Sequence, residues 1–248
     1  MKAMILAAGL GTRLRPLTND RPKALVEVAG QTLLEITLRR LRDCGVREVI
    51  VNVHHFAEMV VEYLEKHKNF GMRVEISRED ILLDTGGGLK KAAWFFLESS
   101  KNDEPFLVHN VDVISNIDLL HMANAHRENH ALATLAVQKR ETSRYLLFDE
   151  HDQICGRQAG SAATPEMVRA AGETHPLAFS GIHVISPRLL SMMAEDGAFS
   201  IITTYLRLAG NGEDISAFHA DEYYWRDLGK PENVAQAAKD AEQQLVRL

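Results

Sequence analysis

Short apolar runs alternate with stretches of helical periodicity through the first 140 residues of the chain. The apolar runs have the length of buried strands and lie at residues 4–8, 48–53, 73–76, 105–109 and 131–137. Apolar residues recur every three or four positions at 32–43, 56–66, 89–97 and 117–126, as in helices with one buried face. This alternation is typical of βα units that build a mainly parallel sheet, so it predicts an α/β fold.

The remaining sequence continues the pattern with less regular spacing. Residues 146–148 and 178–185 are predicted strands, and residues 187–193, 200–208 and 231–245 are predicted helices. A polar, Gly/Ala-rich stretch at about 156–175 is expected to be an insertion or flap. Because no repeat or linker interrupts the chain, we expect a single domain over residues 1–248, built as a three-layer α/β/α sandwich with a mixed, mainly parallel sheet.

Composition narrows the function classes. The chain has 248 residues, 46% of them hydrophobic, which suffices for one large core. Its formal net charge of −6 lacks the basic excess of a nucleic-acid binder, so small-molecule partners are expected. The two cysteines, Cys44 and Cys155, have neither the spacing of a zinc site nor the number needed for a disulfide framework. A protein of the reducing cytoplasm is therefore expected. No apolar stretch approaches the roughly 20 residues that span a bilayer, so we expect a cytoplasmic protein without a membrane segment, monomeric or homodimeric.

The clearest chemical signal follows the first predicted strand, where residues 6–18 read LAAGLGTRLRPLT. Gly9 and Gly11 allow backbone N–H groups to approach an anion, and Thr12 adds a hydroxyl donor. Arg13 supplies a planar fork for phosphate oxygens, and Lys23 supplies a mobile cation. Neither a G-x-G-x-x-G nor a G-K-[ST] pattern is present. The alternative is a tight turn with solvated arginines.

Two distant aspartates are candidate metal ligands. Asp112 follows a predicted strand together with Asn110, and polar residues at the carboxyl end of a strand indicate a site. Asp227 lies in the late segment WRDLGKPE. Two carboxylates that converge from distant positions can hold Mg²⁺ while it bridges phosphates. Asp227 as a surface turn residue is the alternative.

Three consecutive glycines, at residues 86–88, precede a predicted helix. Without side chains, their backbone could approach a flat base or a ribose closely. The alternative is a flexible loop and helix entry in which Thr85 is the cap. Composition alone leaves both open.

These strings together resemble the sugar-phosphate nucleotidyltransferase family, whose pattern runs L-A-A-G-x-G-T-R-L-x-P-L-T, then P-K, an aspartate after a strand, and W-x-D-x-G-x-P-E. The resemblance implies that Lys23 contacts the phosphates at the reacting centre, and that Asp112 and Asp227 bind the metal, Mg²⁺. It places the triphosphate on a set of loop residues, namely Ala8, Gly9, Gly11, Thr12 and Arg13.

The same resemblance extends to the base and the sugar. It makes Glu79, Thr85, Gly86 and Gly87 the base-side candidates, and D-T-G-G-G is similar to members that transfer uridylyl to N-acetylmuramate 1-phosphate. Asn110 and Gly181 are the candidates on the sugar side. Two departures are Val111, where glycine is usual, and a missing E-K-P triplet, for which residues 156–158 could substitute.

The expected reaction joins a nucleoside triphosphate, with UTP favoured, to a sugar 1-phosphate and releases pyrophosphate. Arg13, Lys23 and Asp112 are the expected catalytic residues. No histidine is required, so His109 and His183 are expected in the core or a pocket wall. Guanylyl transfer to mannose 1-phosphate and cytidylyl transfer to a small phosphate stay open, as does a non-catalytic regulatory module. The missing third glycine disfavours an oxidoreductase.

Overall fold

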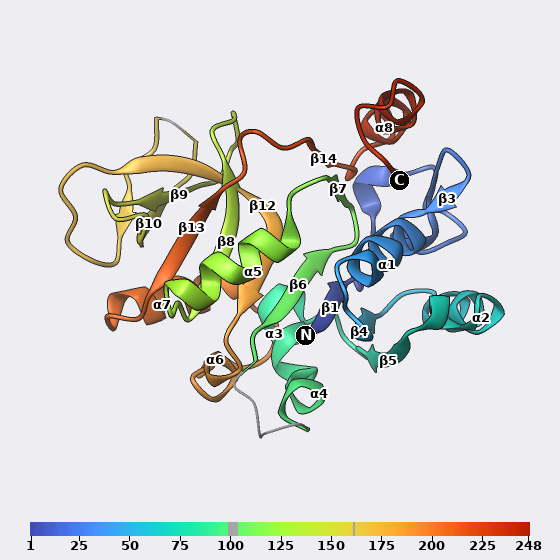
Figure 1. Cartoon of the computed structure of the whole chain (residues 1–248), viewed down its shortest axis with the longest axis horizontal. Coiled ribbons are helices and arrows are strands. Elements are labelled where there is room, and N and C mark those ends of the chain that lie inside the picture. The colour runs from blue at the N-terminus through green and yellow to red at the C-terminus, as the bar shows by residue number, and fades with distance from the viewer. Residues whose placement is uncertain (99–103, 161) are drawn as a thin grey trace.

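The computed structural model describes residues 1–98, 104–160 and 162–248, and they form an α/β fold around one large mixed sheet (Figure 1). The described sheet has ten strands. Eight of them run in the order β11 (Glu166–Met167), β10 (Ile154–Gln158), β9 (Tyr145–Phe148), β12 (His175–Ile185), β6 (Phe106–Asn110), β1 (Lys2–Leu6), β4 (Glu48–Val53) and β5 (Arg73–Arg78). Of the other two, β8 (Ala133–Gln138) pairs with β12, and β13 (Ile215–His219) pairs with β8.

The centre of the sheet is parallel. Strands β6, β1, β4 and β5 all run in one direction, whereas β12 is antiparallel to β6 and to its other two neighbours, β8 and β9. The carboxyl ends of β6, β1, β4 and β5 therefore meet at one edge, where loops from distant parts of the sequence can form a site. The expected mixed sheet with a parallel centre is confirmed.

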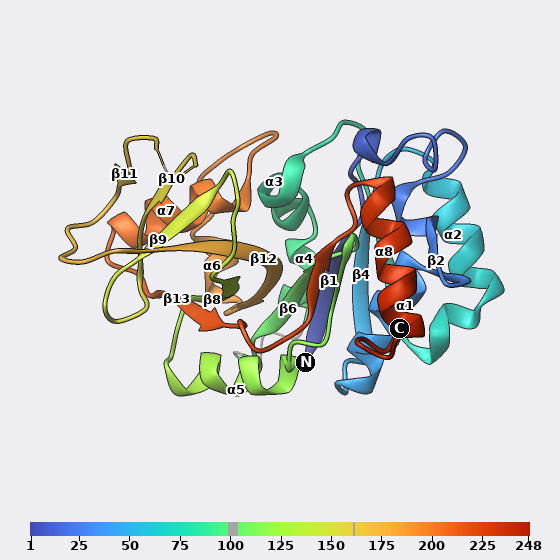
Figure 2. The same ribbon diagram turned by 90° about the horizontal axis from the view of Figure 1, so that it is seen from above.

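Helices cover both faces of this sheet, which confirms the expected three layers (Figure 2). Alternate residues of β1 belong to different cores: Ala3 and Ile5 to one, Met4 and Leu6 to the other. The first core is shared by α1 (Leu33–Asp43), α2 (Ala57–Lys66), α5 (Leu119–Glu128) and α8 (Pro231–Glu242). The second is shared by α3 (Asp84–Lys91), α4 (Ala93–Leu97), α6 (Arg188–Ser191) and α7 (Ile201–Gly210). No described helix is long and apolar enough to cross a membrane.

One sequence prediction about local structure is wrong. The helix expected at 89–97 is two helices that meet at Ala92, and the first of them begins at Asp84. The three glycines therefore lie inside α3 rather than in a loop before a helix. The expected flap at 156–175 holds most of β10 and all of β11, which extend the sheet at its edge; residue 161 lies outside the described residues.

The glycines of α3 make room for another segment. A Cβ on Gly86 would lie 2.3 Å from the ring of Phe199, and a Cβ on Gly87 would lie 2.4 Å from the carbonyl oxygen of Gly197. The N–H of Gly86 also donates to the Phe199 carbonyl at 2.9 Å. Close packing of α3 against the segment before α7 thus requires glycine here, and tertiary packing overrides the poor helix propensity of these residues.

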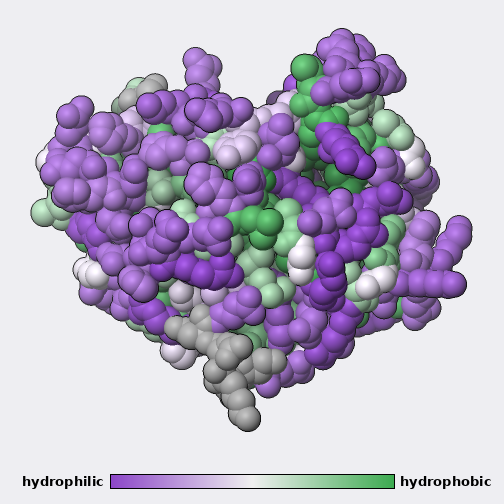
Figure 3. All heavy atoms as spheres, viewed as in Figure 1, coloured by the Kyte–Doolittle hydropathy of each residue, from purple (hydrophilic) through white to green (hydrophobic). Residues whose placement is uncertain are grey.

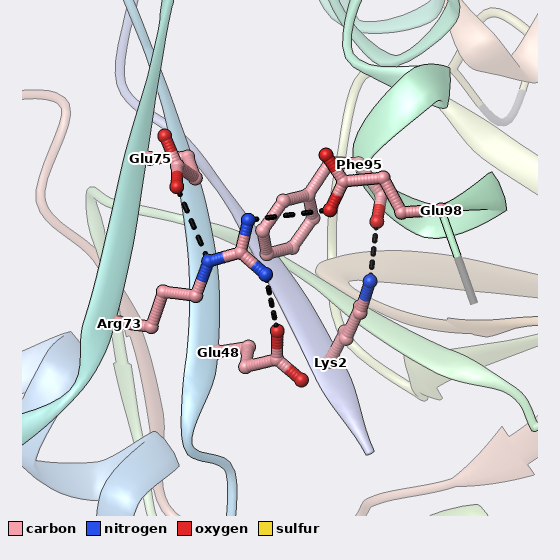
Figure 4. Close-up of polar contacts among 6 residues, drawn as sticks. All are labelled: Lys2, Glu48, Arg73, Glu75, Phe95 and Glu98. Carbon is pink, nitrogen blue, oxygen red and sulfur yellow. Dashed lines mark hydrogen bonds and ion pairs between the residues drawn. The ribbon is translucent and has the colours of Figure 1, made fainter.

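Charged side chains tie α4 to the amino ends of the strands, at the edge opposite to the carboxyl ends. Arg73 pairs with Glu48 at 2.9 Å and with Glu75 and Glu98 at 3.2 Å each, and its guanidinium lies over the Phe95 ring (Figure 4). All the charged partners are well exposed, so each pair contributes little to stability. The network positions α4 and lies away from any candidate catalytic group.

The packing of α3 generates a stability prediction. Gly87→Ala should lower the free energy of unfolding by about 2 kcal/mol, because its Cβ would clash with a backbone carbonyl that cannot move freely. Alanine would raise the free energy of unfolding by about 1 kcal/mol if helix propensity decided the outcome. Urea denaturation measures the difference. Lys91→Ala, at an exposed position of α3, is the control and should change stability by less than about 0.5 kcal/mol. A Gly87→Ala protein as stable as the wild type would contradict the packing argument.

Candidate active site

Asn52, at the carboxyl end of β4, anchors the loop that follows β1. Its Oδ1 accepts hydrogen bonds from the N–H groups of Ala7 at 2.7 Å and Ala8 at 3.3 Å. Its Nδ2 donates to Glu79 Oε1 at 2.7 Å, and all these groups are buried. Since β1 ends at Leu6, two residues earlier than the sequence predicts, the amide of Asn52 takes over the backbone N–H groups that leave the sheet.

Lys23 lies across the two glycines of this loop. A Cβ on Gly9 would lie 3.1 Å from Lys23 Nζ, and a Cβ on Gly11 would lie 3.1 Å from Lys23 Cβ. Gly11 also has a φ of 63°, a left-handed conformation that favours glycine, and its carbonyl accepts from the Thr18 hydroxyl at 2.8 Å. The sequence requires glycine at both positions so that the ammonium can reach the turn.

Lys23 also pairs with Asp112, and this is the strongest electrostatic contact of the site. Their Nζ and Oδ2 atoms are 3.2 Å apart, and the side chains are 14% and 13% exposed. Burial is the largest single effect and opposes ionisation of Asp112, but the Lys23 ammonium, a backbone N–H and Arg13 together hold the pKa of the carboxyl below its ordinary value. Asp112 is therefore a carboxylate at neutral pH.

Strand pairing brings Asp227 beside Asp112. The short strands β7 (Val113–Ser115) and β14 (Trp225–Asp227) pair antiparallel, with Asp227 opposite Val113. The N–H of Leu228 donates to the carbonyl of Asp112 at 2.8 Å. The two carboxylates thus come from neighbouring positions of one ladder, as a shared metal site requires.

Arg40, on α1, donates hydrogen bonds to β7 and to the segment that follows it. Its guanidinium donates to Ser115 Oγ at 2.6 Å and to the carbonyl of Ile117. Burial lowers the pKa of Arg40 to about 10, so the group is still charged at neutral pH. Hydrogen bonds from this cation to β7 and to the segment after it stabilise the backbone that follows Asp112.

Val111 departs from the glycine expected before the first aspartate, yet it fits. It is fully buried, and its N–H donates to the Leu6 carbonyl at 3.2 Å. It is not among the described residues with a positive φ. The backbone before Asp112 therefore needs no glycine in this chain.

Arg13 reaches the acidic pair from the glycine loop. A Cβ on Gly229 would lie 2.8 Å from both Arg13 Nη2 and Asp227 Oδ1, so the guanidinium and the carboxylate border the same point. The N–H of Gly229 donates to Asp227 Oδ1 at 3.0 Å. Thr12 and Arg13 are themselves exposed, so a ligand can reach them.

The donor set fits a hard divalent cation. Asp112 and Asp227 lie on neighbouring backbone segments and carry carboxylate oxygens, the ligand type that Mg²⁺ prefers. Among the residues that the structure describes, no group of three or more acidic, histidine or cysteine side chains could hold a metal. Two protein carboxylates leave most of an octahedral shell to water and phosphate oxygens, as is usual for Mg²⁺ at nucleotide sites.

Asn110 and Gly181, the sugar-side candidates, are neighbours. Gly181 has a φ of 74°, and a Cβ there would lie 2.8 Å from Asn110 Nδ2. It lies in a register shift of β12, between Phe179 and His183. Asn110 Oδ1 is buried without a hydrogen-bond partner among the described residues. The two residues form a polar, close-packed corner at the end of β6.

The base-side candidates have structural contacts of their own. Thr85 Oγ1 accepts from the N–H of Ile201 at 3.0 Å, at the start of α7. Glu79 Oε1 accepts from Asn52, and Glu79 Oε2 accepts from the N–H of Leu83 at 2.9 Å. Their role toward a base stays a prediction. The sequence analysis missed Asn52, although an amide inside the otherwise apolar run 48–53 is a signal for such a role.

His109 and His183 lie buried in the interior of the fold. Burial lowers the pKa of both His109 and His183 to about 3, so both are neutral. His183 shares a hydrogen bond of 2.7 Å with the hydroxyl of Tyr205 in the core. The expectation that these histidines lie in the interior is confirmed.

Comparison with known proteins agrees with this geometry. Residues 2–154 match the family model described as nucleotidyl transferase. The chain is 36% identical to an N-acetylmuramate alpha-1-phosphate uridylyltransferase of Caulobacter vibrioides, over 97% of each chain. It is 30% identical to a mannose-1-phosphate guanyltransferase of Yarrowia lipolytica over 94% of this chain, but it spans only 62% of that longer protein.

Solved structures share the fold. A structure of HddC from Yersinia pseudotuberculosis complexed with GMP-PN superposes with a TM-score of 0.72 at 22% identity, over 97% of this chain and 99% of that one. A UDP-glucose pyrophosphorylase complexed with UDP-glucose gives 0.75 at 16% identity, over 98% of both chains. The fold, the converging loop and aspartates, and the match over most of the sequence lead to one conclusion: the chain belongs to the nucleotidyl transferase family.

Proposed function

We propose that this protein condenses a nucleoside triphosphate with a sugar 1-phosphate to give a nucleoside diphosphate sugar and pyrophosphate. One observation supports the proposal most: the pairing of β7 with β14 brings together the backbone segments that carry Asp112 and Asp227, Lys23 pairs with Asp112, and Arg13 borders Asp227 at Gly229. Two carboxylates and two cations around an open loop suit a polyphosphate and the divalent cation that accompanies it.

The loop after β1 is proposed to hold the triphosphate. Its backbone turns through Ala8, Gly9 and Gly11 and presents N–H groups without side chains in the way. Thr12 adds a hydroxyl, and the exposed Arg13 can swing onto phosphate oxygens. Anchoring by the Asn52 amide keeps the loop in this shape before a ligand arrives.

The reaction needs positioning and charge rather than a base. A sugar phosphate is already an anion, so its oxygen can attack the α-phosphorus in line while the bond to the leaving pyrophosphate breaks. Lys23 and Arg13 offset the negative charge that gathers on the phosphate oxygens. The interior histidines are buried and neutral, which agrees with a mechanism without proton abstraction.

Asp112 and Asp227 would hold Mg²⁺, which when bound would neutralise phosphate charge as a Lewis acid. Until then Lys23 balances Asp112, so the carboxylate stays ionised and ready to bind a cation. Asn110 and Gly181 are proposed to contact the sugar, and Glu79, Thr85, Gly86 and Gly87 to shape the base side.

UTP and N-acetylmuramate 1-phosphate are the favoured substrates. The uridylyltransferase of Caulobacter vibrioides matches this chain over almost its whole length, whereas the guanyltransferase of Yarrowia lipolytica has additional sequence. Both cysteines are free thiols, which supports the proposal that the enzyme works in the reducing cytoplasm.

Removal of one metal-binding charge tests the site. Asp112→Asn should leave the protein folded but lower pyrophosphate formation by roughly 100-fold or more, because the metal loses an ionised ligand. Coupled pyrophosphate detection measures the rate, and circular dichroism checks folding. Asp43→Asn, at an exposed carboxylate on α1, is the control and should keep its activity. Activity of Asp112→Asn within about threefold of wild type would refute the assignment.

Arg13 is expected to bind phosphate rather than water alone. Arg13→Ala should lower kcat by roughly 100-fold, since it removes a charge that acts on the reacting phosphates. Arg15→Ala removes an equally exposed arginine two residues away and should have little effect. Steady-state kinetics distinguish the two variants, and equal kinetics for Arg13→Ala and the wild type would remove Arg13 from the mechanism.

Substrate choice is tested with a matrix of four nucleoside triphosphates against several sugar 1-phosphates in the presence of Mg²⁺. The highest pyrophosphate yield is expected for UTP with N-acetylmuramate 1-phosphate, and chelation of the metal should abolish it. A maximum at GTP with mannose 1-phosphate would favour the guanylyl alternative. No product in any combination would favour a non-catalytic role.

A further inference from the structure

A basic pocket lies beside the proposed sugar site. Its volume is about 410 Å³, and it opens between the segment after β8 and the face of β9, β10 and β12. In the space-filling view, the upper edge of the molecule is hollowed between the lobe that carries β9, β10 and β12 and the lobe that carries α8 (Figure 3). The pocket is lined by Lys139, Arg140, Glu141, Tyr145, Gln158 and Pro176.

Arg140 is held rigidly in the wall of this pocket. Its Nη2 donates to the carbonyl of Phe179 at 2.7 Å, and its guanidinium stacks 3.7 Å above the ring of Trp225. Trp225 in turn donates from Nε1 to the carbonyl of Ser180 at 2.8 Å. A planar cation fixed on two sides can present its remaining donors in a constant direction.

The guanidinium lacks a full set of partners. Its Nε–H is buried and has no hydrogen-bond acceptor in the described part of the chain. Burial lowers the pKa of Arg140, and the Asp227 carboxylate only partly offsets this. No carboxylate pairs with Arg140 within ion-pair distance among the described residues, in contrast to Arg73 or Arg207. A half-buried cation with an unmet donor is costly unless an anion completes it.

The position of Arg140 links it to the sugar rather than to the base. Its contact Phe179 lies two residues before Gly181, and its contact Trp225 lies two residues before Asp227. A sugar held at Gly181, with its 1-phosphate toward Asp227, would therefore extend a ring substituent toward Arg140. Lys139 adds a second cation to the pocket against one carboxylate, Glu141, so the lining favours a negative group.

We propose that Arg140, supported by Lys139, binds a carboxylate carried by the sugar ring, so that the protein selects sugar 1-phosphates with a second acidic group. This inference rests on the proposed function and assigns its acceptor specificity to two residues. The planar fork of arginine suits a carboxylate, and an acceptor without that group would leave the buried cation unpaired.

Two acceptors that differ only in this group provide the test. N-acetylmuramate 1-phosphate carries a lactyl ether carboxylate, and N-acetylglucosamine 1-phosphate has a hydroxyl at that position. With UTP and Mg²⁺, the wild type should have a kcat/KM at least about 20-fold higher for the acidic acceptor. In Arg140→Met the ratio should fall to within about threefold of unity, chiefly through a higher KM for the acidic acceptor.

Matched variants separate recognition from structure. Arg144→Met removes an arginine from the same segment that does not line the pocket, and it should keep the wild-type ratio. Arg140→Lys should recover part of the preference, because it restores the charge without the fork. Thermal denaturation checks that each variant is folded.

Four outcomes are informative. A collapse of the ratio in Arg140→Met, with partial recovery in Arg140→Lys, supports the proposal. Equal losses for both acceptors mean that Arg140 serves the shared phosphate or the fold, and this overturns the proposal while nucleotidyl transfer stands. A wild type that prefers the neutral acceptor also overturns it. A wild type that releases no pyrophosphate with either acceptor, or with any in the matrix, rejects the proposed function itself.

Discussion

The pairing of β14 with β7 is the contact on which the candidate site depends. Asp112 follows the central strand β6, and Asp227 comes from a segment near the end of the chain, so nothing local relates them. The three residue pairs of this small ladder, together with the hydrogen bond from Leu228 to Asp112, bring the carboxylates together. A contact of such long sequence separation has a high entropic cost, and the surrounding core must stabilise it.

Fixed positive charge lies around the segments that carry the two aspartates. Lys23 pairs with Asp112 directly, Arg13 borders Asp227 at Gly229, and the buried Arg40 lies beneath β7. Together with a backbone N–H and Arg13, the Lys23 ammonium holds the pKa of the Asp112 carboxyl below its ordinary value against the effect of burial. Arg13 is exposed and Lys23 lies across the glycine loop, where both could contact the phosphates of a ligand. Charge balance in the free protein and ligand binding therefore use the same groups.

Features that depend on local sequence could be predicted, whereas features that depend on contacts between distant residues could not. Regular apolar periodicity predicted most of β1, β4, β6, α1, α2 and α8, because burial on one or two faces dictates such patterns. The glycine loop and both aspartates could be proposed from residue type, since each side chain has chemistry of its own. Strands β7, β13 and β14 were not predicted, because their few residues carry no period of their own. Arg140 gave no signal among the polar residues 138–145, since only the fold puts Trp225 beneath it.

The glycine run of α3 shows why sequence alone could not assign the base side. Glycines in a nucleotide-binding protein suggest close approach of a ligand, but here Gly86 and Gly87 accommodate Phe199 and Gly197. Packing and a role at the site are compatible only if these glycines set the position of α3 and do not themselves contact a ligand. Its start is tied by Glu79 to Asn52, which also anchors the phosphate loop, and Thr85 holds the beginning of α7. Helix α3 therefore connects the triphosphate side of the sheet to the lobe that would hold the sugar, and its glycines set how closely those two parts can pack.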